Sequence, residues 1–251
     1  MALPNIAELG MTWGWCRGTG DWAGVQAAID RNAPVQVIQE AGSTQWQAGL
    51  PPQHPFQFGF PKHTVETQPP SDSPAARIWI SPIQRQFGPA SIPKVQWHPR
   101  VLWVGIGCER GTPLRVIDVG IQHVLQAYHL AAGAVAGVAT IASKADEVGL
   151  VTYCADRHLP FRCFTTDQLS AVTVPHPSAV VGAAVGTPSV AEAAALLSSQ
   201  LQSSQLENID AIGESNTQPP RLQVPKQVFR LEGEPGSVTI AIAQAIQEYA
   251  E

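Results

Sequence analysis

The sequence predicts an α/β protein, in which a small α/β module precedes a three-layer α/β/α domain with a mainly parallel sheet. From about residue 97 onward, apolar runs of strand length alternate with helical patterns. This order is typical of a parallel sheet covered by helices on both faces. Up to that point, six of the seven Trp residues lie among segments rich in Pro and Gln, which predict turns and loops. We therefore expect two domains, residues 1–96 and 97–251.

In the first module, Asp21 is placed to cap a short helix over residues 23–29. An apolar run at 35–38 predicts a strand, and residues 77–81 alternate with period two, as a strand with two different faces does. The Trp residues are expected to fill a modest core. Stacking of Trp on a flat ligand is the alternative, but burial is their usual role.

In the second domain, Thr112 and Pro113 have the form of an N-cap and a first helical residue. Apolar residues then recur three and four apart, which predicts a helix that faces a sheet through Leu114, Ile117, Ile121, Val124 and Tyr128. Further helices are expected over 146–158, from about 189 to 197 and over 243–249, and a loop over 198–220. The expected strands span 101–108, 134–141, 160–164, 179–185, 224–231 and 238–242.

Composition excludes several classes of protein. The chain of 251 residues is 44% hydrophobic, enough to bury a core, and its net charge of −5 with only 15 Lys and Arg argues against nucleic-acid binding. We expect no membrane span and no signal peptide, hence a cytoplasmic protein. The four scattered Cys residues predict reduced thiols, and no His or Cys spacing suggests a metal site.

Three predicted junctions from strand to helix place helix N-termini at one edge of the sheet, where ligands of open α/β sheets bind. Unpaired backbone N–H groups and helix dipoles attract anions there. Arg110 and Lys144 add positive charges to this edge. The sequence therefore predicts a site for a small acidic molecule.

Several of these residues allow a purely structural interpretation. Gly105 and Gly107 resemble a dinucleotide-binding turn, but the third glycine is missing, and close packing of a helix on the sheet explains them equally. Cys108 is either a nucleophile at a strand end or a core residue. Asp146 and Glu147 supply a general base or stabilise a helix start. Ser143 with Asp146, and Ser189 with Glu192, have the spacing of capping boxes.

Three blocks carry a family resemblance: residues 105–112 (GIGCERGT), 144–150 (KADEVGL) and 186–193 (GTPSVAEA). They resemble, in the same order, signature blocks of the CbiG/CobE C-terminal domain. The resemblance extends over 224–226 and 238–241, and residues 18–22 through 76–80 are similar to the middle region of CbiG proteins.

The resemblance implies a role in cobalamin biosynthesis. CbiG proteins open the δ-lactone of cobalt-precorrin-5A and release acetaldehyde, giving cobalt-precorrin-5B. Asp146 or Glu147 would then handle protons. Residues in or beside the blocks would bind the tetrapyrrole: Gly105, Gly107, Cys108, Arg110, Gly111, Thr112, Ser143, Lys144, Gly186, Thr187, Ser189 and Glu192. No cofactor is implied, because the substrate carries the cobalt.

One difference from the family concerns partners. CbiG proteins carry an N-terminal domain with a Gly-Gly-Ala-Asn motif, which this sequence does not contain. We expect the chain to be a fragment or to work with a separate N-terminal domain, or with a fused or associated precorrin methyltransferase. The alternative function is a non-catalytic module, similar to CobE, that binds or carries a corrinoid.

Overall fold

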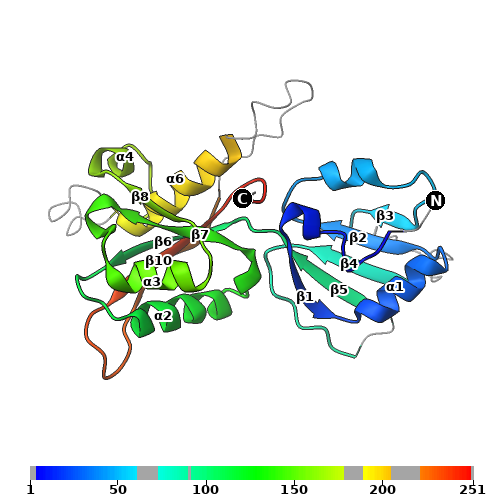
Figure 1. Ribbon diagram of the computed structural model, residues 1–251, viewed down its shortest axis with the longest axis horizontal. Coiled ribbons are helices and arrows are strands. Elements are labelled where there is room, and N and C mark those ends of the chain that lie inside the picture. Colours follow the sequence, from blue (N-terminus) through cyan, green and yellow to red (C-terminus); the bar gives the residue numbers. More distant parts are fainter. Residues whose placement is uncertain (1–3, 61–72, 90–91, 178–188, 205–220, 250–251) are drawn as a thin grey trace.

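The computed structural model describes residues 4–60, 73–89, 92–177, 189–204 and 221–249. In these ranges the chain forms two domains side by side, each built on a five-stranded sheet (Figure 1). The first sheet ends in sequence at His98 and the second begins at Leu102. The change of domain therefore falls a few residues beyond position 97.

The first sheet has the strand order β1-β5-β4-β2-β3. Its strands are β1 (Cys16–Gly20), β2 (Val35–Gln39), β3 (Phe56–Phe58), β4 (Ala76–Ile80) and β5 (Lys94–His98). All neighbours are parallel except β1 and β5. Helix α1 (Trp22–Asp30) packs on this sheet, and two short 3-10 helices, η1 (Met11–Trp13) and η2 (Gln45–Gly49), complete the domain.

Local signals in this domain were interpreted correctly. The Asp21 carboxylate accepts a hydrogen bond from Gly24 N at 2.8 Å, and so caps α1 as expected. Strand β4 alternates buried and half-buried side chains. Trp15, Trp46 and Trp97 lie in the hydrophobic core, which confirms that Trp residues fill it.

The second sheet has the strand order β8-β7-β6-β10-β9. Its strands are β6 (Leu102–Cys108), β7 (Val135–Ile141), β8 (Phe161–Phe164), β9 (Arg221–Phe229) and β10 (Val238–Gln244). Strands β6, β7 and β8 are parallel, and β10 runs antiparallel to both of its neighbours, β6 and β9. Only β10 therefore opposes the other strands, and the sheet is mainly parallel, as predicted.

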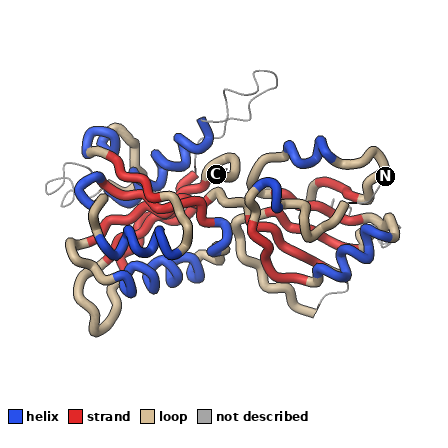
Figure 2. Tube along the Cα trace, in the orientation of Figure 1, coloured by secondary structure: helices blue, strands red, loops and turns tan. Residues whose placement is uncertain are grey.

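Helices cover both faces of this sheet, which gives the three layers expected (Figures 1 and 2). On one face lie α2 (Leu114–Ala127) and α3 (Val148–Asp156), and on the other lie α4 (Thr166–Ser170) and α6 (Val190–Ser204). Two 3-10 helices, η3 (Ala132–Ala134) and η4 (Ala142–Lys144), flank β7. Ile117, Ile121 and Val124 of α2 are buried in the core, as their spacing predicted.

Some boundaries differ from the expectations. The closing helix predicted over 243–249 was wrong, because β10 continues to Gln244 between two strands and residues 245–249 form no helix. Helix α6 continues to Ser204, into the segment expected to be a loop. The predicted strand 179–185 and residues 205–220 of that loop lie outside the described residues. Tyr128 is 37% exposed, because α2 ends at Ala127.

Two of the expected helix caps of the second domain were also wrong. Pro113, not Thr112, is the N-cap of α2, and the Thr112 hydroxyl donates instead to Glu109 O at 2.9 Å. Helix α3 begins at Val148 rather than Asp146, and Ser143 and Asp146 form no capping box because η4 occupies this turn.

Main-chain hydrogen bonds join the two domains. Gln84 N donates to His129 O at 2.7 Å, and Ala131 N donates to Pro82 O at 2.8 Å. Near these bonds lies a cavity of about 730 Å³, lined from the first domain by Gly14, Cys16 and Gln84 and from the second chiefly by α2 and the end of α3.

No helix within the described ranges has the length and apolarity that crossing a bilayer requires.

Candidate functional site

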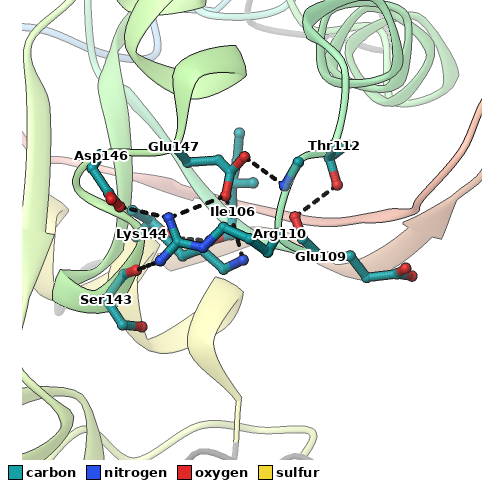
Figure 3. Close-up of polar contacts among 10 residues, drawn as sticks. Ile106, Glu109, Arg110, Thr112, Ser143, Lys144, Asp146 and Glu147 are labelled. Atoms are coloured by element: carbon teal, nitrogen blue, oxygen red, sulfur yellow. Dashed lines mark hydrogen bonds and ion pairs between the residues drawn. The ribbon is translucent and has the colours of Figure 1, made fainter.

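The ends of β6 and β7 bring together two loops of the predicted site. Both strands are parallel neighbours, so the loops that follow Cys108 and Ile141 leave the sheet at the same edge. One loop carries Arg110, and the other carries Lys144 together with Asp146 and Glu147 (Figure 3). We call these four side chains the charged cluster.

Arg110 is the exposed centre of the charged cluster. Its Nη1 lies 2.6 Å from Asp146 Oδ1, and its Nη2 donates to the Ser143 carbonyl oxygen at 2.7 Å. The side chains of Arg110 and Asp146 are 59% and 80% exposed. Their hydrogen bond raises the pKa of Arg110 and lowers the pKa of Asp146. Both groups are therefore ionised at neutral pH.

Glu147 is the buried member of the charged cluster, with its side chain only 4% exposed. Its Oε1 accepts a hydrogen bond from Gly111 N at 2.8 Å, which ties the β6 loop to the start of α3. Its Oε2 lies 3.5 Å from Lys144 Nζ and 3.6 Å from Arg110 Nη1. These distances hold an ion pair but exceed hydrogen-bond length, so this buried oxygen has no hydrogen-bond partner among the described residues.

Cys108 lies at the end of β6 beside the charged cluster. Burial raises the pKa of this thiol to about 11, although Lys144 and Arg110 act to lower it. At neutral pH the group is therefore a thiol rather than a thiolate. The geometry favours the structural interpretation of Cys108 over the nucleophilic one.

The two glycines of β6 differ in their surroundings. A Cβ atom at Gly105 would lie 1.9 Å from Ala191 O and 2.7 Å from Ala195 N, so Gly105 is needed where α6 crosses the sheet. At Gly107 the nearest atoms would be 3.9 Å away. Gly105 thus serves helix packing, while Gly107 leaves room beside the strand end.

The third predicted junction, at residues 186–192, shares no described hydrogen bond or ion pair with Arg110 or Lys144. Gly186 and Thr187 lie outside the described residues, and Ser189 is buried at the start of α6. Within the described ranges, neither Ser189 nor Glu192 bonds to Arg110 or Lys144.

Glu192 is fully buried, and its carboxylate links three segments of the second domain. It accepts hydrogen bonds from Lys226 N at 3.1 Å, from His176 N at 3.3 Å, and lies 3.0 Å from His176 Nδ1. The sequence interpretation missed His176 and Lys226, since these contacts cross 16 and 34 residues without a local pattern. It also missed Glu109, whose carboxylate accepts a hydrogen bond from the Ser237 hydroxyl at 2.6 Å.

No group of three or more His, Cys, Asp and Glu side chains with the arrangement of a metal site occurs in the part of the chain that the structure describes. The carboxylates of the charged cluster are instead paired with Arg110 and Lys144. The chemistry available here is recognition of a carboxylate by Arg110, donation from the N–H groups of helix starts, and proton transfer by carboxylates.

Fold and site together define a class: a two-domain α/β protein with a charged cluster at the carboxyl edge of a mainly parallel sheet. Comparison with family models then identifies the family. Residues 102–243 match the model of the cobalamin synthesis G C-terminus, and residues 6–99 match that of the cobalamin biosynthesis central region. The chain belongs to this CbiG family, through its middle and C-terminal domains, and therefore to cobalamin biosynthesis.

One curated relative is the cobalt-precorrin-5A hydrolase of Priestia megaterium, with 26% identity over 175 residues. The match covers 69% of this chain and 46% of the relative, so the chain spans about half the length of that protein.

The similar solved structures include the following three. CobE, a protein from the cobalamin biosynthetic pathway, is 24% identical, with 59% of this chain and 95% of CobE covered and a TM-score of 0.46. The cobalamin biosynthesis protein chiG of Agrobacterium tumefaciens is 26% identical, with 58% and 98% covered and a TM-score of 0.37. A cobalamin biosynthesis protein G homologue of Sulfolobus solfataricus is 14% identical, with 97% and 61% covered and a TM-score of 0.40.

Proposed function

We propose that this chain supplies the middle and C-terminal parts of a cobalt-precorrin-5A hydrolase, which opens the δ-lactone of its substrate and releases acetaldehyde to give cobalt-precorrin-5B. The observation that supports this proposal is the charged cluster, in which an exposed Arg110 lies beside two carboxylates and Lys144. The named activity of the Priestia megaterium relative supports it further. The cobalt arrives with the substrate, and the proposal needs no other cofactor.

Arg110 is suited to bind one of the acetate or propionate arms of the macrocycle. Its present partner Asp146 is highly exposed, and exposed ion pairs contribute little to stability, so a substrate carboxylate can take the place of Asp146. The guanidinium is held in position by Ser143 O, independently of Asp146. Lys144, whose side chain is 16% exposed, adds a second positive charge to the cluster, 3.5 Å from Glu147 Oε2.

Lactone hydrolysis needs an activated water and donors for the oxyanion. Carboxylates of the cluster, Asp146 or Glu147, supply the proton acceptor. The first turn of α3 begins at Val148 beside the cluster, and the N–H groups of a helix start are donors of the kind that stabilise an oxyanion.

Incubation with cobalt-precorrin-5A, with and without a separately expressed CbiG N-terminal domain, tests the proposal. We expect acetaldehyde, released by the chain alone or only by the mixture; product only in the mixture supports a split enzyme. Arg110→Gln should raise KM, whereas Arg115→Gln, which removes an exposed arginine paired with Glu234 at 3.4 Å, should not. Binding of the substrate without product in either case supports the alternative, a corrinoid carrier.

We also propose that the enzyme acts in the cytoplasm, as the sequence predicts. A fused or associated precorrin methyltransferase would deliver the substrate there. Co-purification of this chain with such a methyltransferase from cell extract tests this partner. The Arg110→Gln variant is purified in the same way for comparison. Fractionation that finds the chain outside the cytoplasm would contradict the location.

A further inference from the structure

The two adjacent carboxylates of the charged cluster have different environments. Asp146 is 80% exposed and binds Arg110 directly, whereas Glu147 is 4% exposed and has one oxygen committed to Gly111. Neighbours in sequence therefore differ in access, in partners and in the number of acceptor positions that remain open. These differences allow separate roles to be assigned to them.

The Oε2 atom of Glu147 is the unexplained feature of this site. It is buried and lacks a hydrogen-bond partner among the described residues, although a carboxylate oxygen in such a position ordinarily accepts one. Its two neighbouring cations are both too far for a hydrogen bond, at 3.5 and 3.6 Å. An acceptor held in this way is suited to a small donor such as a water molecule, placed between Lys144 and Arg110 at the start of α3.

We infer that Glu147 holds and deprotonates the hydrolytic water, and that Asp146 occupies the position on Arg110 that a substrate carboxylate takes. This inference deepens the proposed hydrolase function and rests on it. It assigns the proton acceptor to one of the two candidate carboxylates. It gives Asp146 a competing role in binding instead of a role in proton transfer.

The lactone step balances with these groups alone. Glu147 Oε2 accepts a proton from water, and the water oxygen forms a bond to the lactone carbonyl carbon, whose electron pair moves to the carbonyl oxygen. When that pair returns, the ring C–O bond breaks, and the leaving oxygen takes the proton from Glu147. The products are a carboxylic acid and an alcohol, and Glu147 returns to its ionised form.

Glu147 is held through both of its carboxylate oxygens. Lys144 and Arg110 lie 3.5 and 3.6 Å from Oε2, so two positive charges flank the oxygen that accepts the proton. Gly111 N anchors the other oxygen, which fixes the direction of Oε2. Asp146, by contrast, is 80% exposed and is paired directly with Arg110.

A matched pair of variants tests the assignment, with acetaldehyde release from cobalt-precorrin-5A as the readout and the N-terminal domain present. Glu147→Gln keeps an oxygen that can accept from Gly111 N, and should lower kcat about 100-fold or more with KM little changed. Asp146→Asn should lower KM about two- to fivefold, because the competing charge is removed. Arg115→Gln, at an exposed position outside the charged cluster, is the control that should leave both kcat and KM unchanged. Thermal unfolding of both variants checks that they are folded.

The outcomes separate the two proposals. If the wild-type protein releases no acetaldehyde, the hydrolase function fails and this inference falls with it. If the wild-type protein is active but a folded Glu147→Gln variant keeps its kcat, or Asp146→Asn loses kcat, the assignment is overturned while the hydrolase function stands. Should Glu147→Gln fail to fold, Glu147→Asp provides the second variant. It keeps the charge but withdraws the carboxylate, and the same loss of kcat is expected.

Discussion

The buried carboxylate of Glu248 accepts a hydrogen bond from Ser43 N at 2.5 Å, across 205 residues of sequence. This bond connects the segment after β10 with the loop after β2, and so joins the two domains. Glu248 is 5% exposed and Ser43 8% exposed, so water does not replace the bond readily. Substitution of Glu248 therefore tests how much this bond between the domains contributes to stability.

Glu248→Ala should destabilise the protein by about 1–3 kcal/mol, because it leaves the buried Ser43 N–H without its acceptor. Urea unfolding measures the change in the free energy of unfolding. Glu232→Ala, at an exposed position, is the matched control and should change it little. An equal effect of the two substitutions would show that the bond to Ser43 does not hold the domains together.

His98 predicts a pH dependence of stability. Its Nδ1 lies 2.7 Å from Ser81 O, its Nε2 is buried without a partner among the described residues, and burial lowers its pKa. The unfolded chain binds a proton at this residue below about pH 6.5, but the folded protein resists it. Stability should therefore be complete above that pH and decrease as the pH falls toward the lower folded pKa.

His98→Asn tests this dependence, since Asn can still donate to Ser81 O. The difference in unfolding free energy between pH 7.5 and pH 5 should be smaller in this variant than in the wild type. His123→Asn, at an exposed position, is the control. If His98→Asn and the wild type lose the same free energy on acidification, His98 is not the titrating group.

The two glycines of β6, Gly105 and Gly107, should differ in how far an alanine in their place destabilises the protein. Gly105→Ala should destabilise the protein by about 1–3 kcal/mol, because the new Cβ overlaps the backbone of α6 at Ala191. Gly107→Ala should be tolerated, since its Cβ meets only ordinary contacts. Thermal unfolding distinguishes them, and a stable Gly105→Ala variant would contradict the close approach of α6.

Cys108 should react slowly with iodoacetamide at pH 7.5, because burial raises the pKa of its thiol to about 11. Its labelling rate, followed by mass spectrometry, should rise steadily up to alkaline pH. Cys108→Ala should retain most acetaldehyde release. Rapid labelling at neutral pH, or loss of turnover in a folded Cys108→Ala variant, would restore the nucleophilic role.

Much of the fold was predictable because its signals are local. Periodicity defined β4 and α2, apolar runs of strand length defined β6 and β7, and the cap at Asp21 defined the start of α1. The position of β10 was not predictable in the same way. Its residues show strand character, but nothing in their pattern states that they run antiparallel between β6 and β9. That arrangement also removed the predicted closing helix.

The candidate site was likewise predictable only in the parts that neighbouring parallel strands determine. Parallel neighbouring strands bring Arg110 and Lys144 to one edge, and both approach Glu147. Which carboxylate turns inward depends on the packing of η4 and α3, which no local motif encodes. The bonds of Glu192 with His176 and Lys226 are likewise tertiary, so the capping interpretation had no means of finding them.

The central place of β10 has a consequence for synthesis on the ribosome. When residues up to α6 have emerged, β6 already has β7 on one side but still lacks its other neighbour, because residues 238–244 are translated much later. The nascent second domain therefore exposes an unpaired strand edge through most of its translation. Chaperone association during that interval, and aggregation when translation stalls before residue 238, follow from this order of assembly.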